Sequence, residues 1–290
     1  MIGALFALGG ALSWGASQII SKAGVAHTSV TRFVLIRALV GLTCMLTYGF
    51  LTSGFTLPEI SLIGWAMLAG ALDFVLGTML FVLALKRIQA HEAASLANSA
   101  PLWGVVGAWI VLGEPFSFTV LVAALLVVAG AYLLTSRNGR RDTGTSTTGF
   151  AMALGAGVSW GVAETVPAKY CLSQGMDAAT FQLIMLCTAT LLLVIVHTIS
   201  RMKGSAPAPT RKGTVTAILS GFLGFFLGWV FWLRGVDLSP ASLVAPLRGA
   251  TIIFAFAGSA VFLKERPTGR ALVGMLLIVS GVVFVLLSAG

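Results

Sequence analysis

Ten apolar segments separated by short polar breaks follow one another along the chain. Each has about the 20 residues with which an α-helix crosses the hydrocarbon core of a bilayer. The runs are continuous and do not alternate between apolar and polar residues, which excludes a transmembrane β-barrel. The pattern predicts an all-α integral membrane protein with ten transmembrane helices. The predicted spans are 2–22, 33–52, 62–85, 91–112, 117–135, 149–170, 178–200, 213–235, 240–263 and 268–288.

The composition supports a membrane protein, because 58% of the residues are hydrophobic and 9% are charged. Soluble domains carry about 25% charged residues. The net charge of +9 does not indicate nucleic-acid binding, because the basic residues are scattered between apolar segments and are not gathered on one soluble face. The three cysteines, Cys44, Cys171 and Cys187, lie in apolar runs without metal-type spacing. We therefore expect the lipid bilayer as a partner, no nucleic acid, no metal and no cofactor.

Lys and Arg residues are distributed unevenly between the two sides of the predicted membrane. The loops after odd-numbered spans hold fourteen of them, whereas the even-numbered loops hold Lys169 and Arg234. Cytoplasmic loops carry the excess of Lys and Arg, so the count predicts a multi-pass plasma (inner) membrane protein with cytoplasmic odd-numbered loops and both termini outside. The fourteen residues are Lys22, Arg32, Lys86, Arg87, Arg137, Arg140, Arg141, Arg201, Lys203, Arg211, Lys212, Lys264, Arg266 and Arg270.

The two halves of the chain repeat one another. Residues 3–15 (GALFALGGALSWG) and 149–161 (GFAMALGAGVSWG) are identical at seven of thirteen positions, and residues 70–77 (GALDFVLG) and 221–228 (GFLGFFLG) at five of eight. Glu114 and Gly130 then align with Glu265 and Gly281.

The repeat predicts a domain organisation of a five-helix unit at 1–136, a hydrophilic linker at 137–148 and a second five-helix unit at 149–290. Five is odd, so the second unit is inverted in the membrane. Inverted repeats are typical of alternating-access transporters, whose substrate site lies at the repeat interface near the bilayer midplane.

These features resemble the drug/metabolite transporter superfamily, and specifically its EamA-type ten-span group. The resemblance implies a central cavity lined by spans 1, 3, 4, 6, 8 and 9, with spans 5 and 10 at the periphery. Members of the group usually have cytoplasmic termini, so the charge count departs from the group here. Substrates of the group include amino acids, nucleotides, sugars and amphipathic drugs. The residues that carry the resemblance are Ser-Trp-Gly in both halves, Ala84 to Ile88 (ALKRI), Ala94 to Leu96 (ASL), Leu112 to Glu114 (LGE) and Leu263 to Glu265 (LKE).

Three ionisable residues lie deep inside predicted spans, namely Asp73 in span 3, Glu164 in span 6 and Arg248 in span 9. A charged side chain at this depth costs about 2.5–3.5 kcal/mol on insertion scales and normally faces the bundle interior. One interpretation is a structural ion pair such as Asp73–Arg248. The other is a site for a charged or zwitterionic solute, with Asp73 and Glu164 as candidates for carrying a coupling proton.

Further polar and aromatic residues are expected beside these groups. Gln18 is the repeat equivalent of Glu164, and Gly224 that of Asp73, so each acid occurs in one half alone. Arg37, near a span end, is expected at the cytoplasmic surface. The other candidate substrate contacts are Trp14, Trp103, Trp160, Trp229 and Asn98, and the candidate hinges are Pro101, Pro167 and Pro246.

The sequence therefore favours a transporter of a small polar metabolite, such as an amino acid or similar zwitterion, working by alternating access as a monomer or homodimer. Arg248 would bind the anionic end of the substrate, and Asp73 or Glu164 the cationic end. An exporter of organic cations or amphipathic drugs is one alternative, and a non-transporting membrane scaffold or sensor is another. No sequence motif for catalysis is present, so we do not expect an enzyme.

Overall fold

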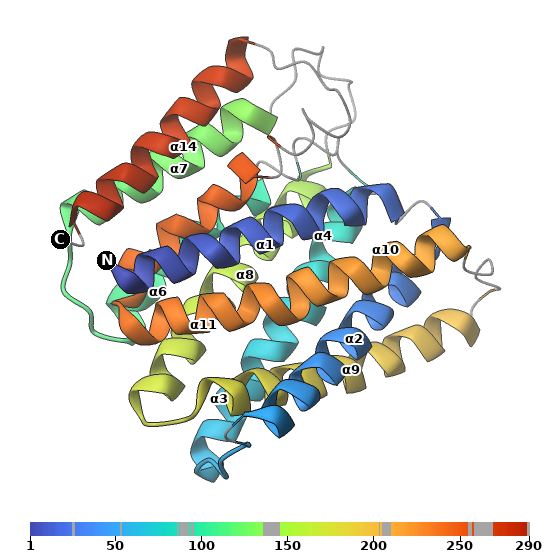
Figure 1. The fold of residues 1–290 in the computed structure, drawn as a ribbon. Helices are drawn as coiled ribbons and strands as arrows, with labels where there is room; N and C mark the ends of the chain where they lie inside the picture. Colours follow the sequence, from blue (N-terminus) through green and yellow to red (C-terminus); the bar gives the residue numbers. More distant parts are fainter. Residues whose placement is uncertain are drawn as a thin grey trace.

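The computed structural model describes residues 1–24, 27–52, 54–85, 87, 93, 96–135, 146–202, 204, 210–254, 257 and 269–288. Within these ranges the chain is all-α (Figure 1). The helical elements are α1 (Ile2–Gly24), α2 (Val30–Leu51), α3 (Ile60–Gly70), η2 (Ala71–Gly77), α4 (Thr78–Leu85), α6 (Ala100–Val111), α7 (Phe118–Thr135), α8 (Thr147–Ser173), α9 (Ala178–Met202), α10 (Arg211–Gly221), η3 (Phe222–Leu227), α11 (Gly228–Leu238), α12 (Ala241–Val244), η4 (Ala245–Gly249) and α14 (Gly269–Ser288).

The order of these elements matches the ten predicted spans one to one. The elements α3, η2 and α4 follow without a break as span 3, and α10, η3 and α11 do the same as span 8. In the described residues, five helical segments are long and apolar enough to cross a membrane, and the remaining spans contain shorter apolar helices. The prediction of an all-α membrane protein is confirmed.

Span 4 is less regular than the sequence indicates. Its first residues lie partly outside the described ranges, and a turn at 98–99 precedes α6. Pro101 therefore stands in the first turn of α6, where its missing N–H costs no helical hydrogen bond. Pro167 lies inside α8, and Pro246 stands at the start of the 3-10 segment η4. Their role as hinges stays a prediction.

The last helices of the two halves, α7 and α14, pack against one another. Gly130 lies against the backbone of Gly274, and Gly281 against that of Ala123. Residue numbers increase along α7 in the direction in which they decrease along the facing side of α14. The two repeat-equivalent helices are therefore antiparallel, as the inverted repeat predicts. Glycine allows the two backbones to approach closely. Figure 1 shows this pair at one edge of the bundle.

Several of the remaining helices pack mainly against helices of the other half. Helix α1 packs along α10, η3 and α11, and its repeat equivalent α8 packs along α3, η2 and α4. Helix α2 packs on its equivalent α9 (Figure 1). These contacts of one half therefore have counterparts in the other, and the interface of the halves runs through the centre of the bundle.

Spans 3 and 8 contain a π-helical segment at equivalent positions. The segment η2 begins at Ala71 and η3 at Phe222, which are 151 residues apart, the same offset as in the repeated sequence. The wider π turn is rare and is often found at functional sites. Neither π-helical segment was predicted from the sequence.

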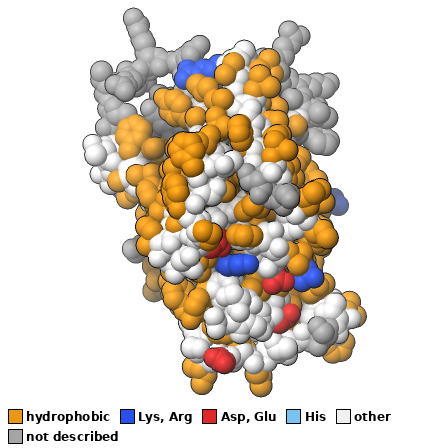
Figure 2. All heavy atoms as spheres, turned by 90° about the vertical axis from the view of Figure 1, so that its left-hand side faces the viewer, with side chains coloured by type: hydrophobic (Ala, Val, Ile, Leu, Met, Phe, Trp, Pro, Cys, Tyr) orange, Lys and Arg blue, Asp and Glu red, His pale blue; other side chains and the backbone are white. Residues whose placement is uncertain are grey.

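The outer surface is largely apolar, as a membrane protein requires. Leucine, isoleucine and phenylalanine side chains on several helices are exposed, such as Leu5 at 60% and Ile110 at 77%. Figure 2 shows one face of the molecule, where apolar side chains cover the upper part and a few charged side chains of both signs gather lower down.

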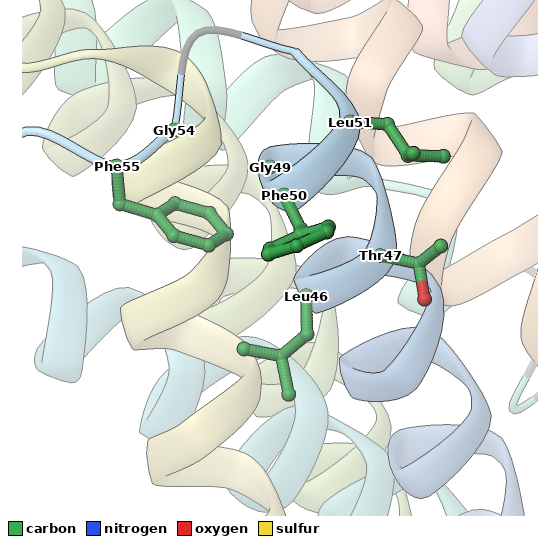
Figure 3. Close-up of a pocket in the computed structure, with 7 residues that line it drawn as sticks. All are labelled: Leu46, Thr47, Gly49, Phe50, Leu51, Gly54 and Phe55. Carbon is green, nitrogen blue, oxygen red and sulfur yellow. The ribbon is translucent and has the colours of Figure 1, made fainter.

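One pocket, of about 620 Å³, lies at the end of α2 and opens to the outside. It is lined mainly by apolar side chains, and none of the ionisable residues predicted as site residues contributes to it (Figure 3). Its lining residues are Leu46, Thr47, Gly49, Phe50, Leu51, Gly54 and Phe55. This pocket is therefore separate from the centre of the bundle.

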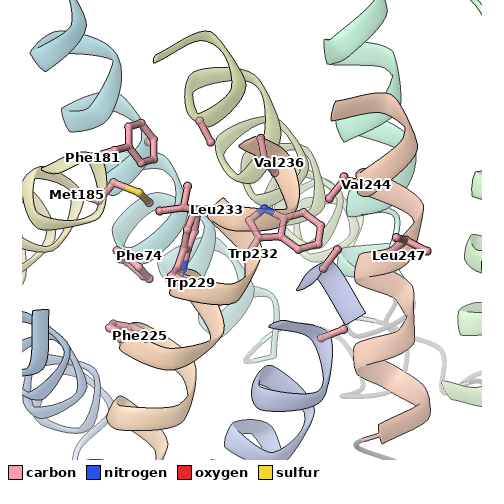
Figure 4. Packing of buried hydrophobic residues seen from close by; sticks show 14 of the residues in the cluster. Phe74, Phe181, Met185, Phe225, Trp229, Trp232, Leu233, Val236, Val244 and Leu247 are labelled. Atoms are coloured by element: carbon pink, nitrogen blue, oxygen red, sulfur yellow. The ribbon is translucent and has the colours of Figure 1, made fainter. Parts of the chain in front are cut away.

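The hydrophobic core includes residues of most spans, and its largest aromatic side chains lie where spans 3, 7 and 8 meet. Trp229 and Trp232 of α11 are 1% and 0% exposed. Phe74 of η2 stacks on its repeat equivalent, Phe225 of η3, with 4.3 Å between the ring centroids. Figure 4 shows these rings together with Phe181 and Met185 of α9. The contact of Phe74 with Phe225 places the symmetry axis of the inverted repeat between the two rings.

Candidate functional site

Glu164 and Arg248 form an ion pair inside the bundle. The Arg248 Nε atom, in η4, donates a hydrogen bond to the Glu164 Oε2 atom, in α8. The two side chains are 15% and 5% exposed, so both charges are largely removed from solvent. The guanidinium also lies 5.7 Å from the centroid of the Trp160 ring. The partner of Arg248 is therefore Glu164 and not Asp73, which corrects the pair named from the sequence.

Asp73 lies beside this pair on the π-helical segment η2. Its carboxyl group adjoins that of Glu164 and interacts electrostatically with Arg248 and Arg37. The residue is 7% exposed. Its Oδ2 atom is buried and accepts no hydrogen bond from the part of the chain that the structure describes. The site thus brings together all three ionisable residues predicted from the sequence.

The repeated Ser-Trp pairs attach spans 1 and 6 to the π-helical segments. The Ser159 hydroxyl donates to the Leu72 carbonyl oxygen (2.7 Å), and the Trp160 indole N–H to the carbonyl oxygen of Asp73 (3.1 Å). The same two bonds recur in the other half. There Ser13 donates to Leu223 (2.7 Å) and Trp14 to Gly224 (2.9 Å).

These four hydrogen bonds show a structural function for Trp14 and Trp160 that the sequence did not indicate. A π-helical turn leaves carbonyl groups whose hydrogen bonds must be made outside the helix, and the Ser and Trp side chains supply the donors. Both tryptophans hold the two halves together at equivalent points. Contact of their rings with a solute stays a prediction.

Arg37 is a site residue that the sequence reasoning missed. It was expected at the cytoplasmic surface, which is wrong, because its guanidinium lies 4.3 Å from the ring centroid of the core residue Phe225. Its Nη2 atom donates to Ser17 Oγ (3.3 Å). The expectation relied on distance from the span end, whereas the face of α2 on which Arg37 lies decides its position.

The remaining predicted contacts occupy different surroundings. Gln18 is exposed and does not join the buried charges. Trp229 belongs to the core, where it packs against Trp14 and Phe74, each with 5.8 Å between ring centroids. Trp103 is partly buried and donates to Ser99 Oγ (3.0 Å), and Asn98 is partly buried in the turn before α6.

Each of the four charged residues of this group has an uncharged repeat equivalent. Asp73 corresponds to Gly224 and Glu164 to Gln18. Gly70 and Gly221 are equivalent and lie against the backbones of Met185 and Arg37 respectively, so Arg37 corresponds to Met185. Residues 100–104 (APLWG) and 245–249 (APLRG) differ at one position, which makes Trp103 the equivalent of Arg248.

The connection between spans 8 and 9 is fixed by two further charged side chains. Lys169 Nζ donates to the carbonyl oxygens of Val236 and Ser239, both at 2.9 Å. The Glu114 carboxylate accepts from the backbone N–H groups of Ala241 (2.6 Å) and Ser242 (2.8 Å). A cation at the end of α11 and an anion at the start of α12 both match the helix dipole.

Comparison with known proteins agrees with this architecture. The model of the EamA-like transporter family matches residues 1–136 and 147–287. A crystal structure that is 18% identical has a TM-score of 0.81 and covers 99% of this chain and 97% of its own, which shows a shared fold.

Two relatives described as uncharacterized transporters align over nearly the whole chain. YvbV of Bacillus subtilis (strain 168) is 26% identical over 94% of this chain and 88% of its own. A protein of Archaeoglobus fulgidus is 21% identical over 99% of both chains. With the family matched over both halves, the chain belongs to the EamA-like transporter family.

Proposed function

We propose that this protein carries a small polar metabolite, most readily an amino acid or similar zwitterion, across the membrane by alternating access of its two halves. The observation that carries the proposal is the group of charges of both signs at the interface of an inverted repeat. Such residues are costly inside a membrane and mark solute pathways. Substrate sites of inverted-repeat transporters lie at this place.

The proposed binding residues are Asp73 and the Glu164–Arg248 pair. Two adjoining carboxyl groups repel one another when both are ionised, and either a proton or a cationic group of a solute relieves the repulsion. Asp73 and Glu164 are therefore the proposed points at which a coupling proton and the solute compete. Arg248 would bind a solute carboxylate when its bond to Glu164 opens.

The buried position of the Asp73 Oδ2 atom, without a donor in the described residues, also favours a second candidate function. An exporter of organic cations would use Asp73 as its binding anion and Arg248 as a structural residue. The two candidates differ in the ligand charge that they require.

Uptake into proteoliposomes tests the proposal. Wild-type protein should take up radiolabelled amino acids from a mixture of the twenty. Glu164→Gln, which installs the residue of the other half, should abolish uptake while the protein remains folded and monodisperse. The double variant Glu164→Gln/Arg248→Met separates loss of transport from loss of fold, because it removes both charges of the pair and leaves neither Glu164 nor Arg248 without its partner.

The outcomes distinguish the alternatives. Unchanged uptake by both variants contradicts the assigned residues. Inhibition by organic cations without inhibition by amino acids supports the second candidate. Absence of flux for every solute tested indicates a scaffold or sensor.

A further inference from the structure

Arg37 is a partly buried cation that no carboxylate of the described residues pairs with. The structure has ion pairs between Arg248 and Glu164 and between Arg234 and Asp237, but none at Arg37. The Arg37 Nε atom is buried and has no acceptor among the residues that the structure describes. Of the five N–H donors of its guanidinium, the structure gives one a partner, the Ser17 hydroxyl.

A guanidinium with so few hydrogen-bond partners away from solvent is unfavourable unless another group stabilises it. A buried polar group that makes no hydrogen bond costs free energy, and an unpaired charge costs more. The face of Phe225 stabilises the guanidinium through a cation–π contact, but it satisfies none of the N–H donors. The arrangement leaves donors free for an acceptor that is not part of the described protein.

The absence of a side chain at Gly224 creates the place that Arg37 occupies. A Cβ atom at Gly224 would collide with Ser17 Oγ and Arg37 Nη2. The equivalent position in the other half carries Asp73. Both charges thus come from the first half: Asp73 lies on span 3 itself, and Arg37 of span 2 reaches into the space beside the equivalent position of span 8, Gly224.

The two opposite charges flank the symmetry axis of the inverted repeat. Asp73 precedes Phe74, and Gly224, with Arg37 beside it, precedes Phe225; the two rings stack at the axis. Arg37 and Asp73 interact electrostatically, yet no hydrogen bond or ion-pair contact connects them. An acid and a base are thus held apart on either side of the centre of the molecule.

We infer that Arg37 recognises the carboxylate of the transported solute while Asp73 receives its ammonium group. The inference rests on the proposed function and deepens it, because it assigns the anion-binding residue and limits the solute to a zwitterion. A planar guanidinium fits a carboxylate through two parallel hydrogen bonds. Arg37 thereby takes the anion-binding role that the proposed function gives to Arg248, because Arg248 already has a carboxylate partner in Glu164.

The test uses three forms of each of the twenty amino acids, namely the free amino acid, its primary amide and its N-acetyl derivative. The amide lacks the carboxylate and the acetyl form lacks the ammonium group. Binding to purified wild-type protein is measured by thermal shift, and transport by competition in proteoliposomes. The amino acid that binds most tightly should bind at least about 10-fold more tightly than either of its derivatives, which is a difference in binding free energy of about 1.4 kcal/mol.

Arg37→Met installs the residue of the other half and removes the donors. It should weaken binding of the free amino acid by about 10-fold or more and leave binding of the amide unchanged, so that the two become similar. Arg37→Lys keeps the charge without the planar donor pair and should recover part of the preference. Arg234→Met, at an exposed arginine, is the matched control and should keep the wild-type preference.

A measurement on wild-type protein makes the result independent of variant folding. Phenylglyoxal modifies arginine, and the modified sites are mapped by mass spectrometry. The free amino acid should protect Arg37 from modification, whereas its amide should not. Equal protection by both forms, or wild-type preference in Arg37→Met, overturns the inference. Absence of any binding by wild-type protein overturns the proposed function instead.

Discussion

The two halves of the molecule share a framework but treat their buried charges differently. In the second half, Glu164 and Arg248 contact one another directly. In the first half, Arg37 and Asp73 stay apart on the two sides of the stacked phenylalanine rings. Each half supplies one acid and one base. We call the Glu164–Arg248 pair closed, because its side chains contact one another, and the Asp73–Arg37 pair open, because its side chains do not.

The framework around these charges is the same on both sides. Ser13 and Ser159 make equivalent hydrogen bonds to the two π-helical segments, and so do Trp14 and Trp160. The repeat has therefore kept the residues that hold the helices together and varied those that carry charge. This separation distinguishes the residues that pack the two halves together from the residues that we propose to bind the solute.

The largest expected effect concerns the closed pair. Arg248→Met leaves the Glu164 charge buried without its partner, and breaking such a pair costs about 3–5 kcal/mol. We expect a large fall in the unfolding midpoint, measured by chemical or thermal unfolding in detergent. Adding Glu164→Gln should restore most of the stability, because the unpaired charge is then removed.

Arg37→Met is the matched change in the open pair. It should cost far less stability than Arg248→Met, or none, because no carboxylate loses a contact partner. Equal losses from the two substitutions would contradict the distinction between a closed and an open pair.

A smaller effect is expected at the two indole donors. Trp14→Phe and Trp160→Phe each remove one hydrogen bond to a π-helical carbonyl oxygen, worth about 1 kcal/mol. Stability should fall to a similar extent in both variants, as measured by urea unfolding in detergent. Transport should fall mainly in Trp160→Phe, because Trp160 holds the backbone of Asp73 and lies beside Arg248. Equal loss of transport in both variants would show that the hydrogen bond from the indole to the π-helical segment, and not the neighbouring charge, limits transport.

The smallest effect is expected at the paired serines. Ser13→Ala and Ser159→Ala each remove one hydrogen bond between helices, a contact worth about 0.6 kcal/mol on average inside membrane proteins. The two losses should agree closely when the unfolding free energies are compared under one detergent condition. A difference above about 1 kcal/mol would show that the framework is less symmetric than its hydrogen bonds indicate.

The sequence predicted the fold well, because span length and repeated motifs depend on local composition. It also identified Asp73, Glu164 and Arg248 as neighbours at one site. The partner of Arg248 could not be predicted, since it depends on the rotation of span 9 relative to span 6. Arg37 was missed because its position depends on the rotation of α2, which the sequence does not reveal. Its equivalence to Met185 follows only from the structure, in which Gly70 lies against α9 and Gly221 against α2. The π-helical segments have no distinct sequence pattern.

The contacts of Lys169 and Arg234 have a consequence for the surrounding lipid. Lys169 is bound to carbonyl oxygens at the end of α11, and Arg234 forms an exposed pair with Asp237. Basic residues attract anionic headgroups by about 1 kcal/mol each when their charge is available at the surface. At this end of the molecule the Lys169 ammonium already donates to backbone oxygens and Arg234 is already paired with Asp237, so phosphatidylglycerol or cardiolipin should gain little from associating with them.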